Sequence, residues 1–204
     1  MTRMPSRRSI VAVALAALAL AGCGERGSTP TKDDMSMGAP AAKLQLVEYA
    51  SPTCPHCARF NQDVFPAFRA KYIDTGKVRY TLKEFLTPPN DVAAASWLLA
   101  RCAGKDKYFT VIDAVFRGQE QMFSGGSPRD TLLQIAQSVG MTEKQFNACV
   151  SDEAALKALD KRIEASMQGE KITGTPTFIL NGKVIGTGEL PIEKLDAAVA
   201  EASK

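Results

Sequence analysis

The sequence predicts an α/β domain that is interrupted by an all-helical insertion, and three observations lead to this fold class. The chain has 204 residues, of which 45% are hydrophobic, so it suits one folded domain carrying an insertion. Strand-like segments lie near both ends of the folded part, and the segments between them have helical patterns. Removing residues 88–168 leaves the order β-α-β followed by β-β-α.

The first part of the α/β domain is predicted in residues 43–87. The apolar segment LQLVEYA, residues 44–50, is typical of a buried strand. The spacing of the next apolar residues predicts a helix, because they recur every four positions: Phe60, Val64, Phe68 and Tyr72. Pro66 should kink this helix. Residues 77–85 then alternate in the manner of a second strand.

The insertion, residues 88–168, is expected to be helical throughout. Asp91 and Asp106 each precede an apolar helical pattern and are predicted N-caps. Thr142 begins a capping-box pattern, with glutamine three residues later. A last long helix is expected over residues 151–168.

The α/β domain resumes in residues 169–204. The apolar runs TPTFIL and KVIG flank Asn181-Gly182, a pair suited to the type I′ turn of a β-hairpin. Pro191 is expected to begin the terminal helix. The second half of the α/β domain is therefore a hairpin followed by a helix.

The basic charge of the chain belongs to its N-terminus. The formal net charge is +3, and residues 1–22 contain three arginines and no acidic residue, so the remainder is balanced. This balance does not indicate a nucleic-acid surface. The arginines precede an apolar run, residues 10–22, that is short for a membrane span and is typical of a signal peptide. Arg7-Arg8 leaves both twin-arginine and general export open.

The signal sequence ends in LAGC, which resembles the lipobox of bacterial lipoproteins. That resemblance implies acylation of Cys23 and a position on the periplasmic side of a bacterial membrane. Cleavage elsewhere would leave Cys23 as a stray thiol in a soluble periplasmic protein. Residues 23–42 are rich in Gly, Ser, Thr, Pro and charge, which predicts a flexible, lipid-anchored tether.

The sequence CPHC, residues 54–57, holds the candidate reactive thiols. Zinc would need a second pair of ligands, and the chain has one histidine, His56, so no metal is expected. A purely structural disulfide between Cys54 and Cys57 would constrain almost no chain. Redox use of the two thiols is the better interpretation.

The two thiols should differ in reactivity. Cys54 stands at the start of the predicted helix, where backbone N–H groups and a protonated His56 favour its thiolate. Cys57 lies one turn into the helix and should be more buried. A substrate thiolate would therefore attack a Cys54–Cys57 disulfide at Cys54, and a second substrate thiolate would release it.

CPHC after an apolar strand resembles the thioredoxin superfamily, and in particular its DsbA-like thiol–disulfide oxidoreductases, in which Cys-Pro-His-Cys, with Pro55 and His56 here, is characteristic. The resemblance covers about residues 43–203. It implies a thioredoxin-like fold with a helical insertion, and it implies that Pro176 is a cis-proline beside the disulfide, with substrate backbone pairing at Thr175. It also matches Glu48 to a buried acid that assists proton transfer at Cys57, although a solvent-facing strand acid stays possible.

The resemblance implies an oxidase that donates disulfides to reduced exported proteins and uses no cofactor beyond its own disulfide. Its usual reoxidant is a quinone-linked membrane oxidase, and a monomer is expected because no added dimerisation region is visible. A disulfide reductase or isomerase is the first alternative. A copper-binding chaperone on a thioredoxin fold, or a non-enzymatic adaptor, is an alternative of another class.

Cys102 and Cys149 fall in predicted helices of the insertion. In an oxidising compartment we expect them to form a structural disulfide, with two buried free thiols as the alternative. Closing a loop of about 48 residues would contribute about 4 kcal/mol in the chain-entropy model.

Overall fold

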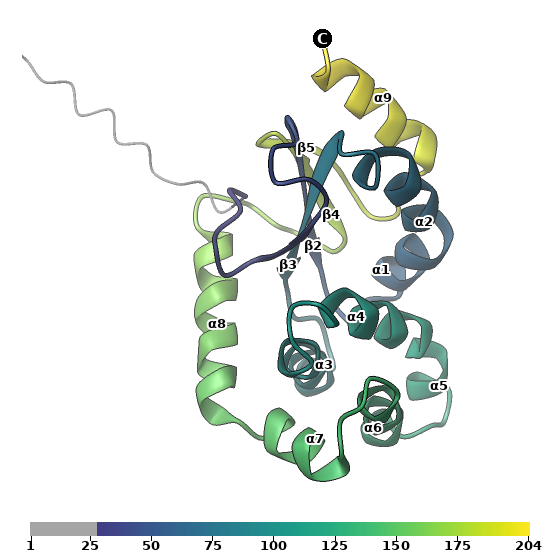
Figure 1. Cartoon of the computed structure of the whole chain (residues 1–204), viewed down its shortest axis with the longest axis vertical. Helices are drawn as coiled ribbons and strands as arrows, with labels where there is room; N and C mark the ends of the chain where they lie inside the picture. Colours follow the sequence, from purple (N-terminus) through teal and green to yellow (C-terminus); the bar gives the residue numbers. More distant parts are fainter. Residues whose placement is uncertain (1–27) are drawn as a thin grey trace, which may run out of the picture.

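A five-stranded mixed sheet forms the centre of a computed structural model, which describes residues 28–204 (Figure 1). The strand order is β1-β3-β2-β4-β5. β2 and β3 are parallel, and every other neighbouring pair is antiparallel. The strands are β1 Met35–Met37, β2 Leu44–Ala50, β3 Val78–Glu84, β4 Thr177–Leu180 and β5 Lys183–Thr187. The two predicted strands and the predicted hairpin are confirmed.

A continuous helical stretch follows β2 and contains two π-helical turns. Its parts are α1 Pro55–Arg59, η1 Phe60–Val64, α2 Phe65–Phe68 and η2 Arg69–Ile73. Pro66 stands in the first turn of α2, directly after a π-helical turn, so the predicted irregularity is a local widening of the helix. Three of the four predicted core residues are fully buried or nearly so, and Val64 is half-buried.

Six helices of the insertion connect β3 to β4. They are α3 Asn90–Cys102, α4 Tyr108–Arg117, α5 Gln119–Phe123, α6 Pro128–Ser138, α7 Glu143–Val150 and α8 Glu153–Met167. α3 to α7 cluster beyond the end of the sheet at which α1 begins, and α8 runs back alongside the sheet toward β4 (Figure 1). This arrangement places the insertion next to the two thiols.

Two predicted helix caps are wrong, and one is confirmed. Pro89 and Lys107 occupy the N-cap positions of α3 and α4, and neither makes a side-chain cap bond. Asp91 instead lies in the first turn of α3, where its charge complements the helix dipole. The capping box at Thr142 is present in full.

The predicted flexible tether is wrong for residues 28–42. β1 pairs with β3, with Met35 opposite Leu82, so this segment forms an edge strand of the sheet. Lys83 Nζ lies 2.6 Å from Asp34 Oδ2 in a mostly buried ion pair that holds the segment down. Sequence composition suggested disorder, but cross-strand pairing ordered this segment. The predicted signal peptide and the lipidation site at Cys23 lie outside the described residues.

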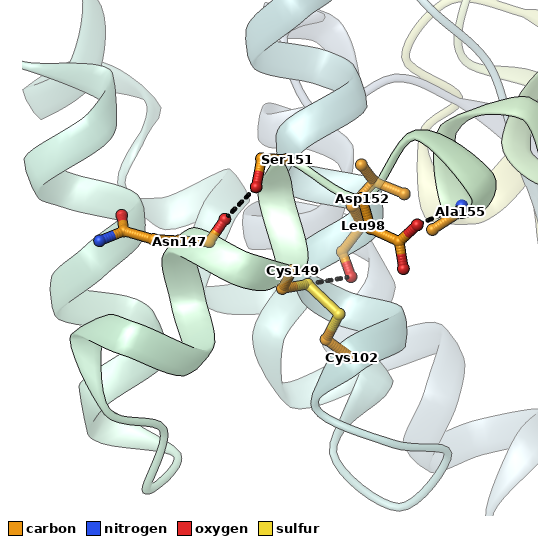
Figure 2. The surroundings of a disulfide bond; sticks show 7 residues. All are labelled: Leu98, Cys102, Asn147, Cys149, Ser151, Asp152 and Ala155. Atoms are coloured by element: carbon orange, nitrogen blue, oxygen red, sulfur yellow. Dashed lines mark hydrogen bonds between the residues drawn. A yellow bond between two sulfur atoms is a disulfide. The ribbon is translucent and has the colours of Figure 1, made fainter.

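A disulfide fastens two helices of the insertion, as the sequence predicts. Cys102 at the end of α3 is bonded to Cys149 in α7, with a Cα–Cα distance of 6.3 Å (Figure 2). The carbonyl oxygen of Leu98, one turn earlier in α3, lies 3.2 Å from Cys149 Sγ. The bond therefore ties two segments that are 47 residues apart in the chain.

Replacing both Cys102 and Cys149 by alanine is expected to destabilise the protein by about 4 kcal/mol, because the unfolded chain gains the entropy of an open loop. Urea unfolding of the variant and the wild type measures this difference. Activity at Cys54 and Cys57 should persist under conditions where the variant is folded. Equal unfolding midpoints would contradict a structural role for the bond.

The C-terminal hairpin and helix form as predicted. Asn181 and Gly182 both have positive φ angles, +48° and +79°, as a type I′ turn requires. Pro191 is the N-cap of α9, Ile192–Ala202, whose buried residues are Leu195 and Val199. None of the helices within residues 28–204 combines the length and the apolar character needed to cross a bilayer.

Candidate functional site

The two CPHC thiols lie at the junction between β2 and α1. Cys54 is the N-cap of α1 and Pro55 is its first residue, where proline is favoured because no N–H bond is lost. Both thiols are free in this structure, and Cys57 is fully buried whereas Cys54 keeps 5% of its surface exposed. The geometry agrees with the order of burial that the sequence predicts.

Buried polar side chains hold the loop between β2 and α1. Ser51 Oγ accepts from the backbone N–H of Thr87 at 3.0 Å, and Thr53 Oγ1 donates to the carbonyl of Thr87 at 2.7 Å. Gln119, on α5, donates from Nε2 to the carbonyls of Pro52 at 2.6 Å and Cys54 at 3.1 Å. The insertion therefore bonds directly to the loop that carries the reactive thiol.

The loop before β4 lies against Cys54. The Thr175–Pro176 peptide bond is cis, and Cys54 Sγ donates to the carbonyl of Thr175 at 3.2 Å. The Thr175 hydroxyl is buried and has no hydrogen-bond partner among the described residues, so it is available to the Cys54 thiolate. Cys54 and the Thr175–Pro176 bond are thus brought together from positions more than a hundred residues apart.

The pKa of Cys54 is lowered from 9.0 to about 5. The largest cause is a hydrogen bond from the Cys57 thiol, opposed by partial burial; the Thr175 side chain and the backbone N–H groups of Cys57 and His56 lower it further. Cys57 behaves in the opposite way. Burial, the hydrogen bond to Cys54 and the nearby Glu48 raise its pKa well above the ordinary value.

Replacing Thr175 by valine is expected to raise the pKa of Cys54, because the thiolate loses a hydroxyl donor. A lost hydrogen bond of this kind is worth about 0.5–1.5 kcal/mol, so the thiolate should be disfavoured roughly two- to tenfold. The pH dependence of thiolate absorbance measures the shift. Thr173→Val, at an exposed position two residues away, is the control. An unchanged pKa in Thr175→Val would show that the hydroxyl does not reach the thiolate.

Glu48 lies in the middle of β2 and is buried, so the alternative of a solvent-facing strand acid is wrong. Its neighbours in the sheet are Leu82 on β3 and Phe178 on β4. Tyr80 donates its hydroxyl to Glu48 Oε2 at 2.6 Å. Burial raises the pKa of Glu48 to about 8, although the Tyr80 bond opposes this shift. At neutral pH the carboxyl group is therefore mostly protonated.

A cavity of about 340 Å³ reaches Glu48 from the side of α2 and α4. Its walls include the Tyr80 ring and Asn61, whose Oδ1 is buried without a partner among the described residues, and charged Asp113 and Arg117 also line it. A polar cavity of this size can hold water. Glu48 thus borders this polar cavity, and its ionised form raises the pKa of Cys57.

The His56 ring contacts Glu189 and Arg59. Its Nδ1 lies 2.7 Å from Glu189 Oε1, and Arg59 Nε donates to the same oxygen at 2.5 Å. Glu189 comes from the segment between β5 and α9. The sequence predicts that a protonated His56 stabilises the Cys54 thiolate, but the groups that lower the pKa of Cys54 are the Cys57 thiol, the Thr175 side chain and backbone N–H groups.

Four residues of the site were missed by sequence reasoning: Arg59, Tyr80, Gln119 and Glu189. Of these, only Tyr80 could have been predicted from the sequence, because the alternation of β3 places its side chain on the same sheet face as Glu48. The others act through contacts between distant segments. Within residues 28–204, His, Cys, Asp and Glu side chains form no group of three or more arranged to hold a metal ion.

Two thiols at the start of a helix that follows a central parallel strand, opposed by a cis-proline loop, define a dithiol site of the thioredoxin type. The chain belongs to the thioredoxin family, since the family model described as Thioredoxin matches residues 30–201. A protein of Rickettsia bellii named as a protein-disulfide oxidoreductase is 34% identical over 172 residues, which are 84% of this chain. The chain spans 60–65% of the length of this and four other Rickettsia relatives.

Solved structures show the same architecture. Wolbachia pipientis alpha-DsbA1 is 26% identical with a TM-score of 0.77, over 85% of this chain and 92% of that chain. BdbD from Bacillus subtilis, in its oxidised form, is 22% identical with a TM-score of 0.73, over 87% of this chain and 96% of that chain. The thioredoxin-like fold with a helical insertion, which the sequence predicts, is thereby confirmed.

Proposed function

We propose that this protein is a thiol:disulfide oxidoreductase that introduces disulfides into exported proteins by exchange at Cys54–Cys57. The observation that carries the proposal is the contrast between the two thiols. The pKa of Cys54 is held at about 5, whereas the pKa of Cys57 is raised above its ordinary value. A stabilised Cys54 thiolate stabilises the reduced protein, so the oxidised protein accepts electrons readily. The names of the Rickettsia relatives support the same chemistry.

The reaction begins when a substrate thiolate attacks Cys54 Sγ of the oxidised protein. The Cys54–Cys57 bond breaks, a mixed disulfide forms at Cys54, and Cys57 leaves as a thiolate that takes up a proton. A second substrate thiolate then attacks the substrate sulfur, and Cys54 leaves as its stabilised thiolate. Two electrons pass from the substrate to the protein, and the substrate leaves with a disulfide.

In this proposal Glu48 supplies the proton that Cys57 needs. It is mostly protonated at neutral pH because its pKa is about 8, and its ionised form raises the pKa of Cys57, so the two groups are coupled. The cavity beside Glu48 gives a route by which solvent restores the proton. In this role Glu48 acts as a general acid in the first step and as a base in the reverse reaction.

The substrates would be reduced exported proteins, whose backbone pairs at Thr175 beside the cis-proline. A quinone-linked membrane oxidase would reoxidise the protein, which would act as a monomer on the periplasmic side of a bacterial membrane. Acylation of Cys23 would anchor it there.

Equilibrium titration of Cys54–Cys57 against glutathione tests the direction of electron flow. A potential near about −120 mV is expected for a strong oxidant. A potential near about −270 mV would overturn the oxidase proposal and favour the reductase alternative. An isomerase would instead be recognised by its ability to rescue a scrambled substrate protein faster than it oxidises a reduced one.

A further inference from the structure

Glu189 belongs to the short segment that joins β5 to α9, and both of its neighbours are fixed. The backbone N–H of Gly188 donates to the carbonyl of Pro176 at 2.8 Å, which ties the segment to the cis-proline loop. Leu190 is buried and packs so closely against Gly186 that an added Cβ there would lie 2.6 Å from it. The backbone therefore presents the Glu189 carboxylate to α1 without depending on the flexibility of a loop.

The carboxylate contacts two side chains of α1, the His56 imidazole and the Arg59 guanidinium. A single oxygen, Glu189 Oε1, lies 2.7 Å from His56 Nδ1 and 2.5 Å from Arg59. Arg59 Nη2 is also 2.7 Å from His56 Nδ1. His56 Nδ1 cannot accept a hydrogen bond from Arg59 while it donates one to Glu189. Because Glu189 Oε1 lies within reach of both side chains, we assign His56 Nδ1 and Arg59 as donors to this oxygen.

This cluster lies within electrostatic reach of the reactive thiol. Arg59 follows His56 by three residues and the N-cap Cys54 by five, and the Cys54 charge contributes to raising the pKa of Arg59. The pKa of Glu189 is lowered, first by Arg59 and then by His56, so the carboxylate is ionised at neutral pH. Asp63 is the other acid whose charge reaches Arg59. Glu189 therefore offsets the positive charge of Arg59, the cation that is coupled to Cys54.

We propose that Glu189 limits the oxidising power of the Cys54–Cys57 couple by neutralising Arg59 and by holding the His56 and Arg59 side chains at the segment between β5 and α9. The inference rests on the proposed function and deepens it. With the carboxylate removed, the field of Arg59 acts on Cys54 without compensation and the thiolate is stabilised further. Glu189 is thus a positioning residue whose charge moderates the reaction, whereas Thr175 and Cys57 promote it.

Glu189→Gln tests the inference, because it removes the charge and keeps the shape. Titration against glutathione should show an equilibrium constant shifted about two- to fivefold toward the reduced protein, the range of an exposed ion pair. The pKa of Cys54 should fall in the same variant, and Glu189→Asp should lie closer to the wild type. Glu193→Gln, an exposed position in the first turn of α9, is the matched control and should leave both values unchanged.

Salt dependence separates a charge effect from a structural one. The difference between Glu189→Gln and the wild type should shrink as ionic strength rises, because exposed charges are screened. No difference at low salt, a shift toward the oxidised protein, or a shift that salt does not change would each overturn the inference. The wild-type potential, read from the same titrations, tests the oxidase proposal separately, since a reducing value would leave the comparison between variants intact.

Discussion

Replacing Cys57 by serine is expected to stop the reaction at the mixed disulfide. Cys54 keeps a hydroxyl donor in place of the Cys57 thiol, which is the largest cause of its low pKa, so its thiolate still forms. No second thiol remains to displace the bound sulfur. With oxidised glutathione as the probe, the variant should accumulate a one-to-one adduct at Cys54. Its oxidase turnover should be lost, and intact mass measures the adduct.

The matched variant, Cys54→Ser, should form little adduct. At neutral pH a thiol with a pKa of about 9 or more is about 1% thiolate or less. A thiolate of higher pKa is a stronger nucleophile than one of lower pKa, so the small thiolate fraction is partly compensated. Access decides the outcome, because Cys57 has no exposed surface. We expect adduct formation to be slower by at least about tenfold. Equal rates in the two variants would contradict the assigned roles of Cys54 and Cys57.

Replacing Glu48 by glutamine is expected to stabilise the reduced protein at alkaline pH. The pKa of Glu48 is about 8 in the folded protein and 4.5 in the unfolded chain. The contribution of Glu48 to the free energy of unfolding is therefore fully present below pH 4.5 and is lost as the pH rises through 8. Glutamine can still accept the Tyr80 hydrogen bond and does not titrate. A pKa rise of this size corresponds to roughly 5 kcal/mol when the group is fully ionised.

Urea unfolding at pH 5 and pH 9, with reductant present, measures this effect. The stability difference between Glu48→Gln and the wild type should be small at pH 5 and should reach several kcal/mol at pH 9. Glu193→Gln, which changes the same group at an exposed position, should follow the wild type at both values. Parallel stability curves for all three proteins would refute the burial of an ionisable Glu48. Slower exchange in Glu48→Gln would support its proposed part in proton transfer.

Local features of the fold were readable from the sequence because they depend on neighbouring residues. The hairpin at Asn181-Gly182 needs positive φ at both positions, which these residues tolerate, and the capping box at Thr142 involves residues three apart. The N-cap predictions at Asp91 and Asp106 were wrong because the start of a helix does not depend on neighbouring residues alone. Where the two helices begin is set by tertiary packing, and their N-caps fall at Pro89 and Lys107.

The N-terminal segment shows how nonlocal contacts override composition. Residues 28–42 lack hydrophobic periodicity, yet β1 completes the sheet edge and the Lys83–Asp34 pair covers it. The contact that the short helix α5 makes with the thiol loop was not expected either. Its Gln119 is buried because it bonds to the carbonyls beside Cys54, a contact across 65 residues of sequence that no local pattern reports.

The sequence by itself determined the chemistry of this protein: the two thiols of CPHC and the fold that carries them are set by short-range patterns and by a family motif. It also identified the disulfide pair of the insertion. Only the tertiary structure decided how the thiols are tuned, because Thr175, Tyr80, Gln119 and Glu189 reach the site from other segments. Hydrogen bonds and charges act over a few ångströms in space, and the fold alone brings these side chains within that distance of Cys54 and Glu48.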